Sequence, residues 1–390
     1  MVAAASISDT AFNTTIDNSV DTSKPRPQIK AKILNDISVC GERLRLGELV
    51  AFPTETVYGL GCHALDVEAV AKVFAAKERP LTDPLIVHVL EPRDAFSLWK
   101  QENPILSKLC NDFWPGPLTL VAEANSKVPS TIMAGTGYCA CRSPSHSTAR
   151  ALLEAAQVPI AAPSANKFGH VSPTTAQHVF DDLQYEDVWI LETEGQEGPC
   201  CDVGVESTVA KLEETQEGGY LLTVLRQGAV SVHTLKDSLT GLPVEVVAKL
   251  KRATKDDVAN VAPGQTIRHY SPNIPSFLLS PACVKSELRA ELLSHSVVID
   301  YGGQLAHWKD HCLAYRDLTP DGSSSAAAQT VFDTLRWAEQ VPGASYVLFP
   351  ELPDSSDALE LAVKDRLTRA ASGIVINALE EATAVLAENS

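Results

Sequence analysis

Between about residue 49 and residue 225, short apolar runs rich in β-branched residues alternate with longer segments of mixed polarity. Short runs of this kind, bounded by turn-forming residues, are typical of buried strands. The runs predicted to be strands are Leu49–Phe52, Leu85–Leu90, Leu118–Ala122, Tyr138–Arg142, Pro159–Ala162, Val188–Leu191, Ser207–Leu212 and Leu221–Leu225.

Apolar residues at helical spacing lie between these runs. Asp66 is placed to cap a helix in which Ala69, Val70, Val73 and Phe74 share one face. Further helices are predicted at Ile105–Phe113, at Thr148–Ala156 and from Thr174 onward, the last capped by Ser172 or Thr174. Many strands interleaved with helices predict an α/β layer fold with a sizeable sheet.

The pattern divides the chain into four predicted parts. Residues 1–27 are rich in Ser, Thr and Asp and are predicted to be a disordered arm, and residues 28–235 form the first domain. Residues 236–275 contain a charged run, several prolines and the sequence Arg268-His269-Tyr270, and are predicted to be a linker. Strict alternation over residues 276–390 predicts a smaller, parallel, Rossmann-like domain. Its predicted strands are Phe277–Leu279, Ser296–Asp300 and Tyr346–Phe349, and its predicted helices are Val284–Leu293, Ala326–Glu339 and Ser356–Ala371.

The charge balance argues against a protein whose main role is to bind nucleic acid. The 390 residues include 49 Asp and Glu against 32 Lys and Arg, a net charge of −17. Such a surface repels phosphate backbones, although it allows a local basic pocket for a small anion. No apolar run approaches the roughly 18 residues that would span a membrane.

The cysteines and histidines do not form a zinc motif. Nine cysteines occur without a CxxC pair, which favours free thiols in a reducing compartment. His307 and His311 are four residues apart but lack further ligands, so a solvated helix face is expected there rather than a metal site. The polar N-terminus has neither a secretory nor a transit-peptide pattern, and a cytoplasmic protein is expected.

Common catalytic signatures are missing from the sequence. It contains no GxxxxGK[ST] loop, no GxGxxG after a strand and no GxSxG elbow. Ser143 and His146 stand close together, but a catalytic triad is not expected there because neighbouring strand residues point to opposite faces.

Polar segments instead follow several predicted strands. Each has an ordinary structural interpretation: helix-end cations for Lys77 and Arg79, a core histidine for His88, and turn or cap chemistry for Ser164 and Ser172. Arg142 ends an apolar strand, where a buried guanidinium needs a carboxylate or phosphate partner.

Taken together and in this order, the segments resemble a known family. The motifs on which this resemblance rests are Pro53–Gly61, Lys77-x-Arg79-Pro80 with Pro84–His88, Ser164-x-Asn166 with Ser172-Pro173-Thr174, and Glu206-Ser207-Thr208. They resemble the YrdC-like domain. With the segment from Pro263-Gly264 to Arg268-His269-Tyr270-Ser271-Pro272 and a C-terminal α/β domain, the chain resembles the long, two-domain form of the threonylcarbamoyl-AMP synthase family over roughly residues 30–380.

The resemblance implies a twisted α/β sheet with a concave, positively charged cavity. It also implies condensation of L-threonine, bicarbonate or CO2, and ATP into threonylcarbamoyl-AMP and pyrophosphate, for threonylcarbamoyladenosine modification of tRNA. No protein nucleophile is needed, and Mg²⁺ is expected to arrive with ATP rather than in a protein metal site. The product is expected to reach the tRNA threonylcarbamoyl-transferase complex by transient contact or by diffusion, which the sequence does not distinguish.

The resemblance also assigns residues to roles. Those with catalytic roles are Lys77, Arg79, Ser164 and Asn166. Those expected at ATP are Arg79, Asp83, Tyr138, Ser164, Ser172, Arg226 and Tyr270. Tyr270 resembles the residue that closes over ATP, which makes the linker at residues 236–275 a candidate lid. Those expected at threonine are Thr56, His88, Arg142, Ala162 and Ser207, with Arg142 pairing the carboxylate.

Three positions depart from the family pattern. Asp83 stands where Asn is common, Tyr138 where Thr is common, and Gln265-Thr266-Ile267 where a Met-Lys-aromatic run is common. An acid beside a triphosphate is unfavourable unless it meets Mg²⁺ or the ribose, and one cation expected over the phosphates is missing.

Two alternatives are weighed against the synthase. A carbamoyl-transferring maturation factor shares the YrdC-like domain, but its additional segments and cysteine spacing are not found in this chain. A non-catalytic RNA- or nucleotide-binding protein is the other alternative. Its RNA-binding form would show a basic stripe with interleaved aromatic residues, whereas this chain is acidic and only 6% aromatic.

Overall fold

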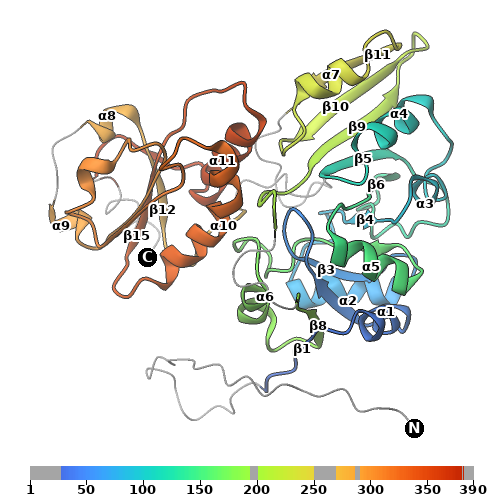
Figure 1. Cartoon of the computed structure of the whole chain (residues 1–390), viewed down its shortest axis with the longest axis horizontal. Coiled ribbons are helices and arrows are strands. Elements are labelled where there is room, and N and C mark those ends of the chain that lie inside the picture. The colour runs from blue at the N-terminus through green and yellow to red at the C-terminus, as the bar shows by residue number, and fades with distance from the viewer. Residues whose placement is uncertain (1–27, 194–200, 250–268, 286–289, 380, 382–390) are drawn as a thin grey trace.

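The computed structural model describes residues 28–193, 201–249, 269–285, 290–379 and 381, which form two sheets with helices (Figure 1). The predicted arm at residues 1–27, much of the predicted linker, and the departures at Gln265, Thr266 and Ile267 lie outside the described residues.

The first sheet has eleven strands in the order β1-β8-β2-β3-β7-β4-β6-β5-β9-β10-β11, with parallel and antiparallel pairs mixed. The strands are β1 Lys32–Leu34, β2 Leu49–Phe52, β3 Gly59–His63, β4 Ile86–His88, β5 Leu118–Glu123, β6 Tyr138–Arg142, β7 Ile160–Ala161, β8 Val188–Leu191, β9 Thr208–Glu214, β10 Tyr220–Arg226 and β11 Val244–Ala248. The helices are α1 Ile37–Arg45, α2 Val67–Lys77, α3 Pro92–Phe96, α4 Pro104–Phe113, α5 Ser147–Ala156, α6 Ala176–Leu183 and α7 Val232–Ser238.

The direction of the central strands positions the polar segments at one edge. Strands β5 and β9 are parallel, and each is antiparallel to its other neighbour, β6 or β10. Strands β6 and β10 therefore run in the same direction and end at the same edge, with Arg142 and Arg226 as their last residues. Ser207 precedes β9, which runs the opposite way, so it lies at this edge too.

Several local predictions are confirmed. Strands β2, β6 and β8 have the predicted bounds. Asp66 caps α2 by accepting hydrogen bonds from two backbone amides, and the predicted apolar face of α2 is buried.

Other elements differ from the prediction. Strands β1 and β3 and helices α1 and α3 have no counterpart among the predicted elements, and α6 is capped by Thr175 rather than by Ser172 or Thr174. Strand β11 lies inside the predicted linker but pairs in parallel with β10, so the first sheet extends beyond residue 235. Strand β3 was missed because Gly59 and Gly61 read as loop residues.

The second sheet has five parallel strands in the order β14-β13-β15-β12-β16, which confirms the Rossmann-like prediction. These are β12 Ser276–Leu279, β13 Ser296–Asp300, β14 Ala314–Asp317, β15 Tyr346–Pro350 and β16 Val375–Ile376. Its helices are α8 Pro281–Val284, α9 Ala290–Leu293, the 3-10 turn η1 Ala306–Trp308, α10 Ser324–Gln340 and α11 Ala358–Ala370. The single helix predicted at 284–293 corresponds to α8 and α9, with residues between them outside the described set.

Helices α10 and α11 face the first domain (Figure 1). One apolar cluster joins Val57, Val171 and Val205 of the first domain to residues such as Phe332 of α10. A Cβ on Gly204 would lie 2.3 Å from the Ala328 carbonyl oxygen, so glycine permits this close approach of α10. The two sheets are therefore packed into one body through these two helices.

A polar cluster lies beside this apolar contact. His170 Nδ1 is 2.8 Å from Asp182 and its Nε2 is 3.0 Å from Glu339 of α10. Arg336 of α10 is 3.0 Å from Asp182. Burial alone would lower the pKa of His170, but the hydrogen bonds that its ring donates to the carboxylates of Asp182 and Glu339 outweigh it and raise the pKa to about 8.

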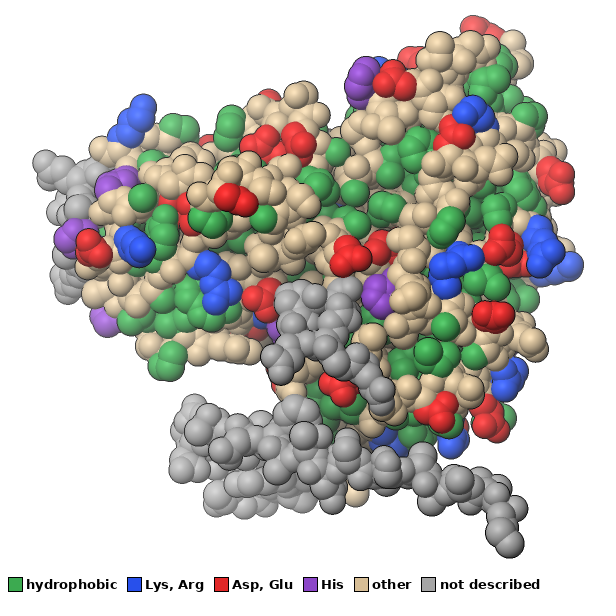
Figure 2. All heavy atoms as spheres, viewed as in Figure 1, with side chains coloured by type: hydrophobic (Ala, Val, Ile, Leu, Met, Phe, Trp, Pro, Cys, Tyr) green, Lys and Arg blue, Asp and Glu red, His purple; other side chains and the backbone are tan. Residues whose placement is uncertain are grey.

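None of the helices in the described part of the chain has the length and apolar character needed to span a membrane. On the face in Figure 2, acidic and basic side chains are interspersed among the described residues.

We expect the stability of the folded chain to fall as pH rises from about 6.5 to above 8. The folded pKa of His170 is raised to about 8 from its ordinary value of 6.5, so its protonation stabilises the fold fully below 6.5 and not above 8. The loss should be about 2 kcal/mol. Thermal unfolding across this pH range measures it, and His170→Gln should remove most of the slope.

His178→Gln is the matched control. His178 also lies near Asp182 and Arg336, but burial, aided by Arg336, lowers its pKa to about 3, so it stays neutral throughout the range. An unchanged pH slope in His170→Gln would contradict the assignment.

Candidate active site

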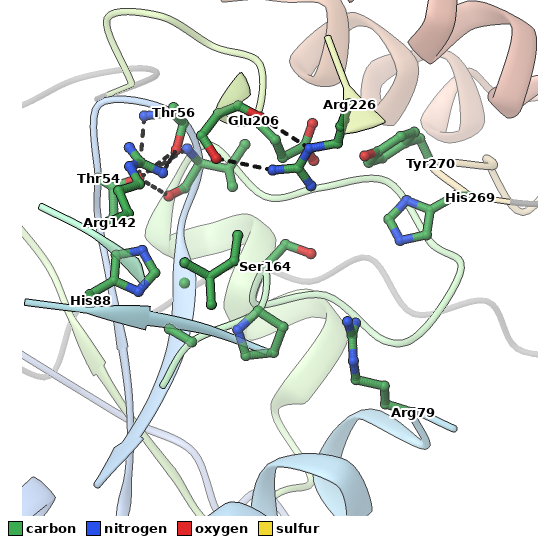
Figure 3. A pocket seen from close by; sticks show the side chains of 16 residues that line it. Thr54, Thr56, Arg79, His88, Arg142, Ser164, Glu206, Arg226, His269 and Tyr270 are labelled. Carbon is green, nitrogen blue, oxygen red and sulfur yellow. Dashed lines mark hydrogen bonds between the residues drawn. The ribbon is translucent and has the colours of Figure 1, made fainter. Parts of the chain in front are cut away.

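A cavity opens between the strand ends and the chain segment that enters the second domain (Figure 3). Polar residues line it from several loops, with Arg142 and Thr56 on one wall and Arg226 on the other (Figure 3). The lining residues are Thr54, Thr56, Val57, Gly59, Arg79, Ile86, His88, Arg142, Ala162, Pro163, Ser164, Glu206, Ser207, Arg226, His269 and Tyr270.

Most of the residues predicted from the sequence meet here. The predicted residues in the lining are Thr56, Arg79, His88, Arg142, Ala162, Ser164, Ser207, Arg226 and Tyr270. Their roles toward ATP and threonine stay predictions.

Tyr138 lies outside this cavity, so the structure does not bring it together with the other predicted residues, and its role toward the nucleotide stays a prediction. It begins β6, whereas Arg142 ends the same strand, so the two are separated by about 13 Å of extended chain. Tyr138 lines a separate pocket, where its ring lies 3.6 Å from the Lys211 ammonium.

Lys77, Asn166, Asp83 and Ser172 lie behind the cavity wall. The buried Lys77 ammonium donates to the carbonyl oxygens of Ser164, at 2.6 Å, and of Asn166. Burial places the pKa of Lys77 well below its ordinary value. Lys77 thus holds the Ser164–Asn166 loop in place in this structure, rather than facing the cavity.

The Arg142 wall is built from an ion pair and hydroxyl groups. Arg142 Nη2 lies 2.8 Å from Glu55 Oε1, and its Nη1 donates to Thr56 Oγ1 at 2.9 Å. Burial tends to raise the pKa of Glu55, but Arg142 outweighs it and the net shift is downward. Burial, with Arg142 next, lowers the pKa of His88 to about 3, so His88 is neutral.

The opposite wall carries two further guanidinium groups. Arg79 forms an ion pair of 2.8 Å with Asp83, and both side chains are almost fully buried. Arg226 donates to the carbonyl and hydroxyl oxygens of Ser207, each at 3.1 Å. These partners of Arg226 carry no formal charge.

His269 and Tyr270 close the cavity on the side of the second domain. Tyr270 is fully buried with a left-handed φ of 62°, and its ring packs 5.2 Å from that of Phe332. Burial places the pKa of His269 well below its ordinary value, so the ring is neutral.

Three carboxylate or imidazole groups of the cavity region have no predicted role. Glu55 and Glu206 stand inside quoted motifs but received no role, because a motif does not reveal which arginine a carboxylate meets. His269 adjoins the predicted Tyr270 and was passed over in the same way.

Two earlier alternatives have structural explanations. Ser143 donates to the Leu90 carbonyl oxygen, and His146 caps α5, so they form no triad. His307 and His311 are exposed, and no group of three potential metal ligands occurs in the described ranges.

The chemistry of this cavity suits a small polyanion. Three buried guanidinium groups surround it, two neutral imidazoles lie beside them, and hydroxyl groups offer further hydrogen bonds. Buried arginines of this kind recognise carboxylates and phosphates through paired hydrogen bonds.

Two family models match the chain in succession. One described as "Telomere recombination" matches residues 42–228, and one described as "Threonylcarbamoyl-AMP synthase, C-terminal domain" matches residues 230–372. A threonylcarbamoyl-AMP synthase from Pyrococcus abyssi is 33% identical over 87% of this chain and 95% of its own length. The chain belongs to the threonylcarbamoyl-AMP synthase family. It is therefore an enzyme of that family.

Further relatives agree. The synthase from Bacillus subtilis is 32% identical over 85% of this chain and 92% of its own length. The structure of Pyrococcus abyssi Sua5 complexed with L-threonine is 31% identical, with a TM-score of 0.73 over 89% of this chain and 98% of that one. A variant of the same protein, with a consecutive His-Tyr pair changed to alanine, has a TM-score of 0.74 and 29% identity, covering 90% of this chain and 98% of that one.

Glu55→Gln should destabilise the fold by about 3–5 kcal/mol, because it leaves the Arg142 guanidinium buried without its carboxylate. Urea unfolding measures the change. Glu123→Gln is the control: it breaks the exposed Lys100–Glu123 pair and should have little effect. Equal midpoint shifts in the two variants would contradict the assignment.

Proposed function

We propose that this chain condenses L-threonine, bicarbonate or CO2, and ATP into threonylcarbamoyl-AMP and pyrophosphate. The observation that carries the proposal is a single cavity with Arg142 and Thr56 on one wall and Arg79 and Arg226 on the other. One wall suits an amino-acid carboxylate and the other suits phosphates. The names of the relatives, and the threonine complex of the Pyrococcus abyssi protein, support the same reaction.

In the proposed reaction, the threonine carboxylate lies against Arg142. The threonine amine attacks CO2 and loses a proton to solvent, which gives a carbamate. A carbamate oxygen then attacks the α-phosphorus of ATP, and the bond to the bridging oxygen breaks to release pyrophosphate. Positioning and neutralisation of charge account for the rate, so no protein nucleophile takes part.

Arg79 and Arg226 are proposed to face the phosphates, with Ser164 on the same loop that Lys77 holds. Mg²⁺ is treated as part of the ATP substrate, and it neutralises phosphate charge there. We further propose that the product serves a tRNA-modifying transferase, which adds the threonylcarbamoyl group to adenosine.

Purified protein with ATP, Mg²⁺ and bicarbonate should release pyrophosphate only when L-threonine is added. Release that needs both threonine and bicarbonate supports the synthase, and mass spectrometry of the product identifies the adenylate. If ATP binds but threonine does not promote release, the protein is a non-catalytic nucleotide-binding member and the proposal fails.

Arg142→Lys and Arg79→Lys should separate the two walls. Lysine keeps the charge opposite each buried carboxylate but loses the planar pair of donors. A lost charge-assisted contact is worth about 1.5–3 kcal/mol, or roughly 10- to 150-fold. Arg142→Lys should raise the KM for threonine by this factor. Arg79→Lys should raise the KM for ATP by the same factor. Equal effects of each variant on both KM values would refute the two-wall arrangement.

A further inference from the structure

One arginine of the second domain reaches the wall of the cavity. Arg366 lies on α11 and has no exposed surface. Its Nε is 3.0 Å from Glu206 Oε2, and its Nη1 donates to the Gln227 carbonyl oxygen at 2.9 Å. Asp365 lies 3.0 Å from the same Nη1.

The two residues that Arg366 contacts in the first domain adjoin cavity residues in sequence. Glu206 immediately precedes Ser207, and Gln227 immediately follows Arg226. Arg226 Nη2 donates a hydrogen bond of 3.1 Å to Ser207 Oγ, and the same Oγ lies 2.7 Å from Thr119 Oγ1 of β5. Arg366 therefore supports both ends of the Ser207–Arg226 contact from outside the cavity.

Glu206 is held from two sides. Its Oε1 accepts a hydrogen bond of 2.6 Å from Ser172, while Oε2 faces Arg366. The backbone here is tightly packed, since a Cβ on Gly228 would lie only 2.5 Å from the Glu206 carbonyl oxygen. Small movements of Glu206 would thus be transmitted to Ser207 and to the end of β10.

Tyr270 also meets this arginine. The Arg366 guanidinium carbon is 5.5 Å from the centre of the Tyr270 ring, a cation–π distance, and Figure 3 shows Tyr270 beside Glu206 and Arg226. Glu206, Gln227 and Tyr270 therefore share a single buried cation from α11, and two of them, Glu206 and Tyr270, line the cavity.

The negative charge of Glu206 makes its contact with Arg366 important for the binding of an anion in the cavity. A carboxylate that lines a cavity for phosphates repels them unless a cation neutralises it. Among the described residues, Glu206 forms its ion pair with Arg366, which therefore supplies the neutralising charge.

We propose that Arg366 is a positioning residue for nucleotide binding, so that the second domain completes the active site of the first. Arg366 neutralises Glu206 and holds Gln227, and by these contacts it keeps Ser207, Arg226 and Tyr270 aligned toward the nucleotide. This inference rests on the proposed function only for the identity of the nucleotide.

The matched control is Arg336. It is a buried arginine of the second domain, it pairs across the same interface with the carboxylate of Asp182, and it donates to the Val171 carbonyl oxygen. It does not line the cavity. Loss of Arg336 therefore weakens domain docking but leaves the cation beside Glu206 in place.

The experiment measures ATP–Mg²⁺ binding by titration calorimetry without threonine, for wild type, Arg366→Met, Arg336→Met and the double variant Glu206→Gln/Arg366→Met. Arg366→Met should weaken ATP binding at least tenfold, while Arg336→Met should change it less than threefold. The double variant should recover a large part of the loss, because it removes the unpaired carboxylate. A merely structural role for Arg366 would give no such recovery.

Equal losses in Arg366→Met and Arg336→Met, or no recovery in the double variant, would overturn the inference. If Arg366→Met fails to fold, the double variant provides the test, because no unpaired Glu206 charge remains in it. ATP binding by the double variant near the wild-type affinity supports the inference. A full tenfold loss of ATP binding overturns it. ATP binding is measured without any reaction, so this test is independent of the proposed function. If wild-type protein binds ATP but releases no pyrophosphate, the proposed function is wrong and this inference can still be tested.

Discussion

Burial of positive charge governs how this protein is built around its cavity. A guanidinium removed from water is tolerated only when carboxylates or several hydrogen-bond acceptors surround it. Each of three buried arginines has a carboxylate within 3.0 Å: Arg79 with Asp83, Arg142 with Glu55, and Arg366 with Glu206. Arg142 with Glu55 and Arg366 with Glu206 each join two distant parts of the chain at the cavity. Arg79 and Asp83 lie only four residues apart, so their pair fixes one local segment of the wall.

The same requirement links the two domains. The apolar packing of α10 and α11 brings the second domain close to the cavity, but apolar packing is not directional. The pairing of Arg366 with Glu206 and of Arg336 with Asp182 adds direction, because each ion pair specifies one position of a helix against one loop. The cavity wall around Tyr270 is thereby supported from behind by residues of the second domain.

Sequence reasoning succeeded where a signal is local. The bounds of β6 and the cap at Asp66 follow from short patterns. Thr56 stands in the motif Pro53–Gly61, and Arg142 was singled out as a guanidinium at the end of an apolar strand. It failed where the structure depends on contacts between distant segments. Strand β3 contains two glycines and is a strand only because β2 and β7 pair with it. Arg366, in an amphipathic helix, reads from the sequence as one charged residue among several. Only the folded contact with Glu206 distinguishes it.

The distribution of paired charge also explains the unusual Asp83. Beside a triphosphate its carboxylate would be repulsive, but it is committed to Arg79, and together they form a neutral pair. Phosphates can reach Arg79 only by sharing it with Asp83. Arg226 differs, since its partners are the neutral oxygens of Ser207, so an anion can bind it without competing for a protein ion pair. A phosphate should therefore bind most strongly to Arg226, at the end of β10. This is the part of the cavity that the second domain supports.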